Sequence, residues 1–238
     1  MDRRAMSVFA EKTIIPVGII AALLYAVGGP WDQMIHVRQG HTLLATPHLI
    51  IGGGLFLYIF SGILAFRIWH GASLAPGERN ILKLIMLGAA VLPFGLVIDE
   101  LWHRIFGVDM TAWSPPHVII FLGIISALLG LALLEANRAR QMRGRFSWSY
   151  IRLVFFLASI FFVALFFFID FDVPTMAYVT QTRPEFSYVG ALTGVITFLL
   201  LLTLAVTKRP GTATLVTLIA WGYYTGMGLA LGVIDFSG

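Results

Sequence analysis

Six residues in two stretches of the chain have the types and the spacing of a metal site. The first stretch, residues 31–54, reads WDQMIHVRQGHTLLATPHLIIGGG, and the second, residues 98–123, reads IDELWHRIFGVDMTAWSPPHVIIFLG. Each contains an aspartate, a histidine four residues later, and a second histidine after a Ser/Thr-Pro element. Two histidines and a carboxylate commonly bind iron, copper or zinc with positions left open on the ion. The candidate ligands are Asp32, His36, His48, Asp99, His103 and His117.

The two stretches align as copies of one unit. The aspartates and the first histidines of the two copies are separated by the same offset in sequence, and the second histidines by an offset only slightly longer. A duplicated helical hairpin whose connecting loop differs slightly in length would give this register. The sequence therefore predicts two equivalent hairpins, each with its own Asp-His-His set.

Helical spacing predicts how each set converges. Residues four apart share one face of a helix, so the aspartate and the first histidine of each copy can point to the same spot. Thr46 and Ser114 precede prolines and are expected to be N-caps of the next helix, which places the second histidine in its first turn. The sequence Gly28-Gly29-Pro30 leaves two alternatives: it ends the first helix, or Pro30 begins a new helical turn.

Further polar residues near the motifs are candidates for a supporting role. Glu100, Asp109 and His41 are possible partners of the ligands. Simpler interpretations stand beside the metal site, because an Asp and a His near a helix end often form an ion pair or a hydrated group at the membrane interface.

The elements that must position these residues are membrane helices. The chain has 238 residues, 58% of them hydrophobic and only 12% charged, whereas soluble domains have roughly 25% charged residues. Cysteine is absent, which excludes thiolate ligands, disulfides and a cysteine nucleophile. The sequence predicts one all-α transmembrane domain, residues 1–238, with seven apolar segments long enough to span about 30 Å. They lie at about 13–30, 47–68, 81–104, 115–136, 151–170, 187–206 and 213–234.

The distribution of positive charge predicts the orientation. Of the 16 Lys and Arg residues, only Arg38, Arg104 and Arg183 fall in the segments that are outside when the N-terminus is inside. Cytoplasmic loops retain positive charge, so we expect an inside N-terminus, with the C-terminus and both metal motifs on the outer face. The run NRARQMRGR is then an inner anchor near anionic lipid rather than a nucleic-acid site. We expect the first apolar segment to be retained, because it has no clear cleavage site.

These motifs resemble the C subunit of the copper-dependent membrane monooxygenases, the family of particulate methane monooxygenase and ammonia monooxygenase. In that family one hairpin has an Asp-x-x-x-His unit and a later histidine after Thr-Pro, which Asp32, His36 and His48 match with a connection one residue shorter. Another hairpin has an Asn-x-x-x-His unit and a histidine fourteen residues on, which His103 and His117 match. The sequence DELWH is similar to the family's NEMWH-type element.

The chain also departs from the family pattern. Asp99 stands where the family usually has asparagine, which adds a negative charge, and the family's acidic residue after the arginine of the first connection is replaced by Gln39-Gly40-His41. The resemblance covers about residues 13–136, and the three additional helices, residues 151–234, lie outside it.

The resemblance implies a function. It implies a subunit that binds copper, with iron and zinc as alternatives, among other membrane subunits of a monooxygenase that oxidises a small apolar or ammonia-like substrate with O2. A copper-binding or copper-delivery protein without turnover, a structural subunit, and a hydrolase with a zinc-bound water remain alternatives. Retinal binding is disfavoured, because the last helix contains no lysine for a Schiff base.

Overall fold

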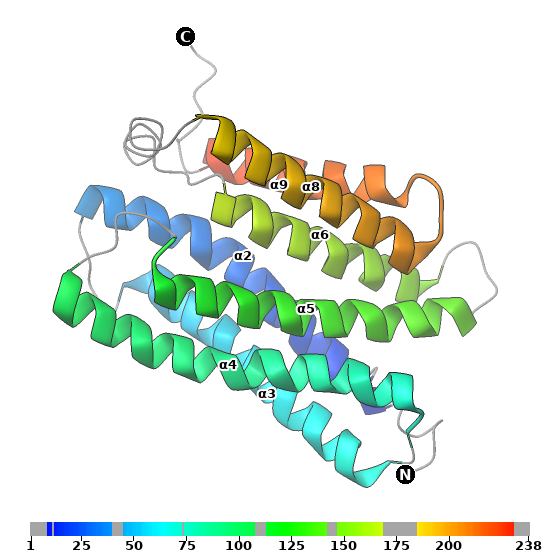
Figure 1. The fold of residues 1–238 in the computed structure, drawn as a ribbon. Coiled ribbons are helices and arrows are strands. Elements are labelled where there is room, and N and C mark those ends of the chain that lie inside the picture. Colours follow the sequence, from blue (N-terminus) through cyan, green and yellow to red (C-terminus); the bar gives the residue numbers. More distant parts are fainter. Residues whose placement is uncertain are drawn as a thin grey trace.

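Helices make up all the regular structure in the described part of this computed structural model, which covers residues 9–10, 12–39, 45–72, 74–107, 113–141, 147–168 and 185–230. Side chains are described for these residues except 33–39, 141, 168, 185–191 and 228. The long helices are α2 (Ile14–Gln39), α3 (Thr46–Gly71), α4 (Pro76–Phe106), α5 (Pro115–Gln141), α6 (Trp148–Phe168), α8 (Glu185–Thr207) and α9 (Thr212–Ala230) (Figure 1).

The fold is an all-α membrane bundle, as the sequence predicts. Each of the seven apolar segments corresponds to one of the helices. Within the described residues, α8 contributes a shorter apolar stretch, Leu192–Thr207. The stretches that are long and apolar enough to cross a membrane are Ile14–Asp32, Thr46–Gly71, Pro76–Phe106, Pro115–Arg140 and Trp148–Phe167.

Helix α2 is longer than the sequence indicates. It runs to Gln39 with Pro30 inside it, so Gly28-Gly29-Pro30 does not end the helix at residue 30. A proline inside a helix removes one hydrogen bond to the carbonyl four residues earlier, and the helix continues on both sides of this gap. Asp32 and His36 therefore belong to one continuous helix, at the spacing that shares a face.

Two hairpins and a central helix organise the bundle. Helix α2 packs against α3, and α4 packs against α5, while α3 and α4 join the two hairpins. Helix α6 is the most enclosed of the candidate spans; it packs on α5 and α9, and α8 and α9 cover it on the side away from the hairpins (Figure 1).

The same close helix contact occurs at the same register in both hairpins. A Cβ atom added to Gly28 in α2 would lie 2.8 Å from Cγ1 of Ile51 in α3, and one added to Gly95 in α4 would lie 2.6 Å from Cγ1 of Ile120 in α5. The two glycines are separated by the same offset as the two aspartates, and the two isoleucines by the same offset as the second histidines.

A second close contact between the two helices also occurs in both hairpins, one to two helical turns further from the ligand motifs. A Cβ atom on Gly54 of α3 would lie 3.0 Å from the carbonyl oxygen of Ala21, and one on Gly123 of α5 would lie 3.2 Å from that of Gly88. Small residues let membrane helices approach closely. Because the same contacts recur at the offsets of the ligand motifs, the internally repeated hairpin is present in the packing as well as in the sequence.

Candidate metal centre

Asp99 and His103 come from the last two turns of α4. They are four residues apart and face the same side of the helix, with 3.6 Å between Asp99 Oδ1 and His103 Nε2. Both side chains are largely buried, and Asp99 Oδ1 itself is shielded from solvent. The spacing of four therefore produces the shared position that the sequence predicts.

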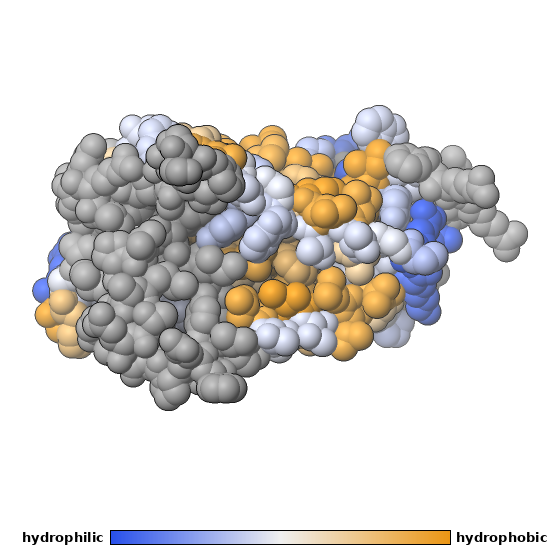
Figure 2. All heavy atoms as spheres, turned by 90° about the horizontal axis from the view of Figure 1, so that it is seen from above, coloured by the Kyte–Doolittle hydropathy of each residue, from blue (hydrophilic) through white to orange (hydrophobic). Residues whose placement is uncertain are grey.

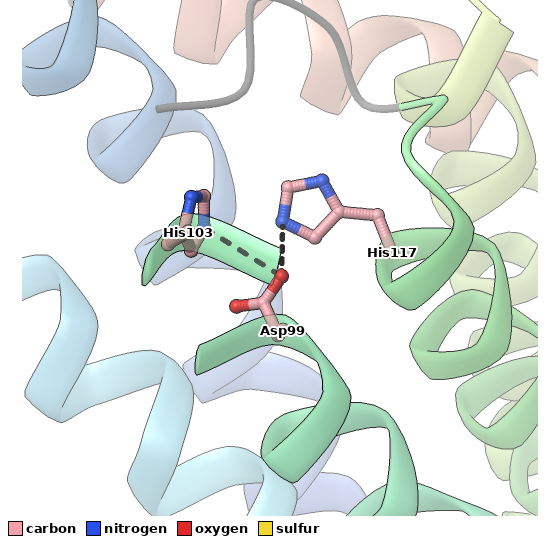
Figure 3. A group of neighbouring side chains, drawn as sticks. All are labelled: Asp99, His103 and His117. Carbon is pink, nitrogen blue, oxygen red and sulfur yellow. Dashed lines mark ion pairs between the residues drawn. The ribbon is translucent and has the colours of Figure 1, made fainter. Parts of the chain in front are cut away.

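His117 completes the group from the first turn of α5. Its Nε2 lies 3.3 Å from Asp99 Oδ1, and Figure 3 shows the carboxylate between the two imidazole rings. The three ligand atoms lie within 4.8 Å of one another. Ligands bound at about 2.1 Å in a tetrahedron are roughly 3.4 Å apart, so the two Asp–His separations already match those around one ion.

A backbone carbonyl orients the ring of His103. Its Nδ1 lies 3.0 Å from the carbonyl oxygen of Gly107; when Nδ1–H donates to that oxygen, Nε2 is left with a lone pair toward Asp99. Metal-binding histidines usually have such a partner on the other ring nitrogen. Gly107 follows the last residue of α4 with φ 84° and ψ −164°, a conformation restricted almost entirely to glycine.

The first hairpin repeats one of these contacts. Nε2 of His48, in the first turn of α3, lies 2.9 Å from Oδ1 of Asp32 in α2, and both side chains are about one-fifth exposed or less. This pair is the counterpart of His117 and Asp99. The structure therefore joins an aspartate of one helix to a histidine of the next in both copies.

The remaining candidate residues have different positions. His36 lies on α2 at the predicted spacing, but its side chain is outside the described residues, as are Asp109 and His41 altogether. Glu100 accepts a hydrogen bond from Arg104 at 2.7 Å on the exposed surface of α4. It is not one of the three residues grouped around Asp99.

One of the predicted N-caps is shifted by a residue. The amide of Leu49 donates to the carbonyl of Ala45 at 3.2 Å, so Ala45 is the N-cap and Thr46 is the first residue of α3. Val118 donates to the carbonyl of Ser114 at 3.0 Å, which gives Ser114 the same position before α5. Ala45 and Ser114 are separated in sequence by the same offset as the second histidines, His48 and His117. Thr46 therefore lies one residue past the position that is equivalent to Ser114.

Both second histidines are consequently the third residue of their helix. The positive end of a helix dipole lies at its N-terminus and favours a nearby carboxylate. Asp32 and Asp99 each contact the histidine in the first turn of the following helix.

Aromatic rings pack together around the first turns of α5, the helix that contains His117. Phe121, one turn after His117 on α5, contacts Phe167 of α6 with 4.6 Å between ring centroids, and Phe167 in turn contacts Trp113 at 4.1 Å. Phe121 also lies 6.1 Å from Phe166, whose ring is near Gly29 of α2. We call Trp113, Phe121, Phe166 and Phe167 the aromatic cluster. It extends from the His117 helix to the Asp32 helix.

Two parts of the site were not identified from the sequence. The carbonyl of Gly107 was missed, although a glycine directly after a helical pattern is a known signal for a C-terminal cap. The end of α6 was missed because its phenylalanines form an unbroken apolar run, which has no periodicity to mark one face.

No model of a known protein family, no curated protein and no solved structure matches this chain. The resemblance to the monooxygenase C subunit therefore stays a prediction from the motifs.

Proposed function

We propose that the protein is a membrane metal-binding subunit of a copper-dependent monooxygenase that oxidises a small apolar or ammonia-like substrate with O2. The observation that carries the proposal is the group of Asp99, His103 and His117, whose ligand atoms lie within 4.8 Å of one another. Ionisable groups at membrane depth are costly and usually functional.

The donor atoms fit a metal ion. Two imidazole nitrogens and one carboxylate oxygen suit copper, zinc and iron alike, so the choice of copper rests on the resemblance. A bound copper ion would supply one-electron redox chemistry and activation of dioxygen. Asp99 would balance part of the ion's positive charge, and the Gly107 carbonyl would hold the His103 ring in its binding orientation.

The surroundings support an apolar or small neutral substrate. Residues four apart share a helix face, so Phe121, four residues after His117 and packed against Phe167, would give the ligand group an apolar wall. An apolar wall suits a neutral substrate better than a charged one.

We place both hairpin sites at the outer face of a prokaryotic cytoplasmic membrane, with the N-terminus inside. The positive-inside distribution of Lys and Arg supports this orientation. Large side chains exposed along α4, including Phe94, Val97 and Ile105, are suited to lipid or to the apolar surface of other membrane subunits.

The experiment uses membranes of the cell that makes the protein, prepared without chelators. Metal is quantified in the purified protein, and a short alkane and ammonium are tested for oxygen-dependent products under reducing conditions. Copper together with an oxygen-dependent product supports the proposal. Copper without any product favours a copper-holding or delivery protein, whereas zinc with oxygen-independent hydrolysis favours a hydrolase.

A further inference from the structure

The end of the bundle opposite the ligand group contains a buried ion network. Glu135 of α5 is fully buried; its Oε1 accepts a hydrogen bond from Arg138 Nη1 at 2.8 Å, and its Oε2 accepts one from Arg152 Nε of α6 at 3.2 Å. Arg152 also donates to Ser149 Oγ at 3.3 Å. Buried charges that are held in this way fix the relative positions of two helix ends.

The turn between α8 and α9 is attached to the same place. Arg140 Nη2 donates to the carbonyl of Val206 at 3.1 Å, near the end of α8. The guanidinium of Arg209 lies 4.5 Å from the ring centroid of Tyr150, and the hydroxyl of Tyr150 is 2.7 Å from Thr212 Oγ1. Segments that are distant in sequence thus meet at one junction.

Among the described residues of this junction, positive charge exceeds negative charge. Among the described ion pairs of the junction, Glu135 is the one carboxylate. It pairs with both Arg138 and Arg152, so this triad has a net positive charge. Arg140 and Lys208 are exposed, and Arg209 is partly exposed. The cations are Arg138, Arg140, Arg152, Lys208 and Arg209.

The surroundings of the junction are those of a lipid headgroup region. Figure 2 shows hydrophobic residues along the middle of the α8–α9 face and hydrophilic residues gathered at the end where α8 meets α9. Leu201 and Leu204 are exposed on α8 just before the turn, and Trp148 is exposed at the start of α6. The exposed leucines would lie at the level of the acyl chains, and the cations and the tryptophan at the level of the headgroups.

We propose that this junction is a binding site for the phosphate of an anionic membrane lipid, with Arg140 and Arg209 as its main cations. Planar guanidinium groups bind phosphate oxygens through two parallel hydrogen bonds. The Glu135 triad holds α5 and α6 together beneath them, and the exposed leucines of α8 accommodate the acyl chains. This site is independent of the metal centre and of the reaction proposed above.

The test compares lipid retention by the full chain in nanodiscs made from phosphatidylcholine with a small fraction of phosphatidylglycerol. Native mass spectrometry counts phosphatidylglycerol molecules that stay bound after release from the disc. The variants are R140Q/R209Q, the charge-preserving R140K/R209K, and the control R67Q/K83Q, which removes two exposed cations of α3 and α4 outside the junction.

We expect R140Q/R209Q to retain at least about tenfold less phosphatidylglycerol than the parent protein, because two charge-assisted contacts are lost. R140K/R209K should retain an intermediate amount, and R67Q/K83Q should behave as the parent protein. Should R140Q/R209Q fail to fold, the comparison of R140K/R209K with the control still decides, because lysine keeps charge and loses the planar fork.

Two results would overturn the proposal. One is equal retention of phosphatidylglycerol by the junction variants and the control, which means that the attraction is diffuse. The other is complete displacement of the lipid by millimolar inorganic phosphate, which means that the site binds free phosphate rather than a headgroup anchored by its acyl chains.

Discussion

Nδ1 of His103 lies 3.0 Å from the carbonyl oxygen of Gly107, four residues further along the chain. The same residue also closes helix α4, because the amide of Gly107 donates to the carbonyl of His103 at 3.0 Å. One glycine therefore ends the helix and fixes the ring of a candidate ligand. The φ of 84° that makes this possible is readily adopted only by residues without a Cβ atom.

Replacing Gly107 with alanine should weaken metal binding without removing a ligand. The strained backbone would move the carbonyl away from Nδ1, and loss of such a partner typically costs about 10- to 100-fold in metal affinity. Gly211→Ala is the matched control, since Gly211 also has a positive φ, 79°, and lies at the far end of the bundle. Titration with a competing chelator measures both; equal affinities of the two variants would contradict the role of the carbonyl.

The two hairpins should bind metal independently. Asp99→Asn should lower the metal content of the second hairpin alone, and Asp32→Asn that of the first alone, because each aspartate contacts a histidine of its own hairpin. The losses should add in the double variant. Elemental analysis per protein chain checks this, and a full loss of metal from either single variant would mean one shared site instead of two.

Much of this arrangement could be predicted from the sequence, because it depends on helical spacing. The Asp-x-x-x-His units, the second histidines in the first helical turn and the repeat all follow from local periodicity. Helix ends were less predictable: the continuation of α2 through Pro30 depends on packing against α3, which a local signal does not contain. The pairing of Glu135 with Arg152 likewise joins separate helices, and nothing in either segment indicates its partner.

Close packing at the glycines between α4 and α5 should be essential to the second hairpin. A Cβ atom on Gly88 would lie 2.5 Å from the carbonyl oxygen of Gly123 and 2.6 Å from the amide nitrogen of Ala127, so Gly88→Ala must push α4 away from α5. We expect a lower melting temperature and a weakened Asp99 site. Gly52→Ala is the control, because Gly52 of α3 has no such neighbour within 4 Å; it should be neutral or stabilising. The same loss in both would argue against the contact.

Removing the buried carboxylate should destabilise the other end of the bundle. Glu135→Gln leaves Arg138 and Arg152 without their buried counterion, and breaking a buried pair typically costs about 3–5 kcal/mol. Glu100→Gln removes an exposed partner of Arg104, which is worth about 0–1 kcal/mol. Thermal unfolding in detergent compares them. Similar melting temperatures for the two variants would show that the network contributes little to stability.

The orientation can be tested directly because the chain contains no cysteine. Single cysteines at Arg104 and Lys208, both exposed at opposite ends of the bundle, should react differently with a membrane-impermeant maleimide in intact cells. We expect labelling at residue 104 and protection at residue 208 until the cells are opened. Labelling of residue 208 alone would place the candidate metal centre inside.

The most direct test is the metal content of the protein purified without chelators in native-like lipid, measured by elemental mass spectrometry for the parent and for His103→Ala, His117→Ala and His70→Ala. His70 lies in the last turn of α3 and contacts the rings of Phe66 and Trp69, so it controls for loss of a histidine as such. The account predicts bound copper in the parent and in His70→Ala, and a clear loss in the other two. Metal at background level in the parent, or unchanged in all three variants, would contradict it.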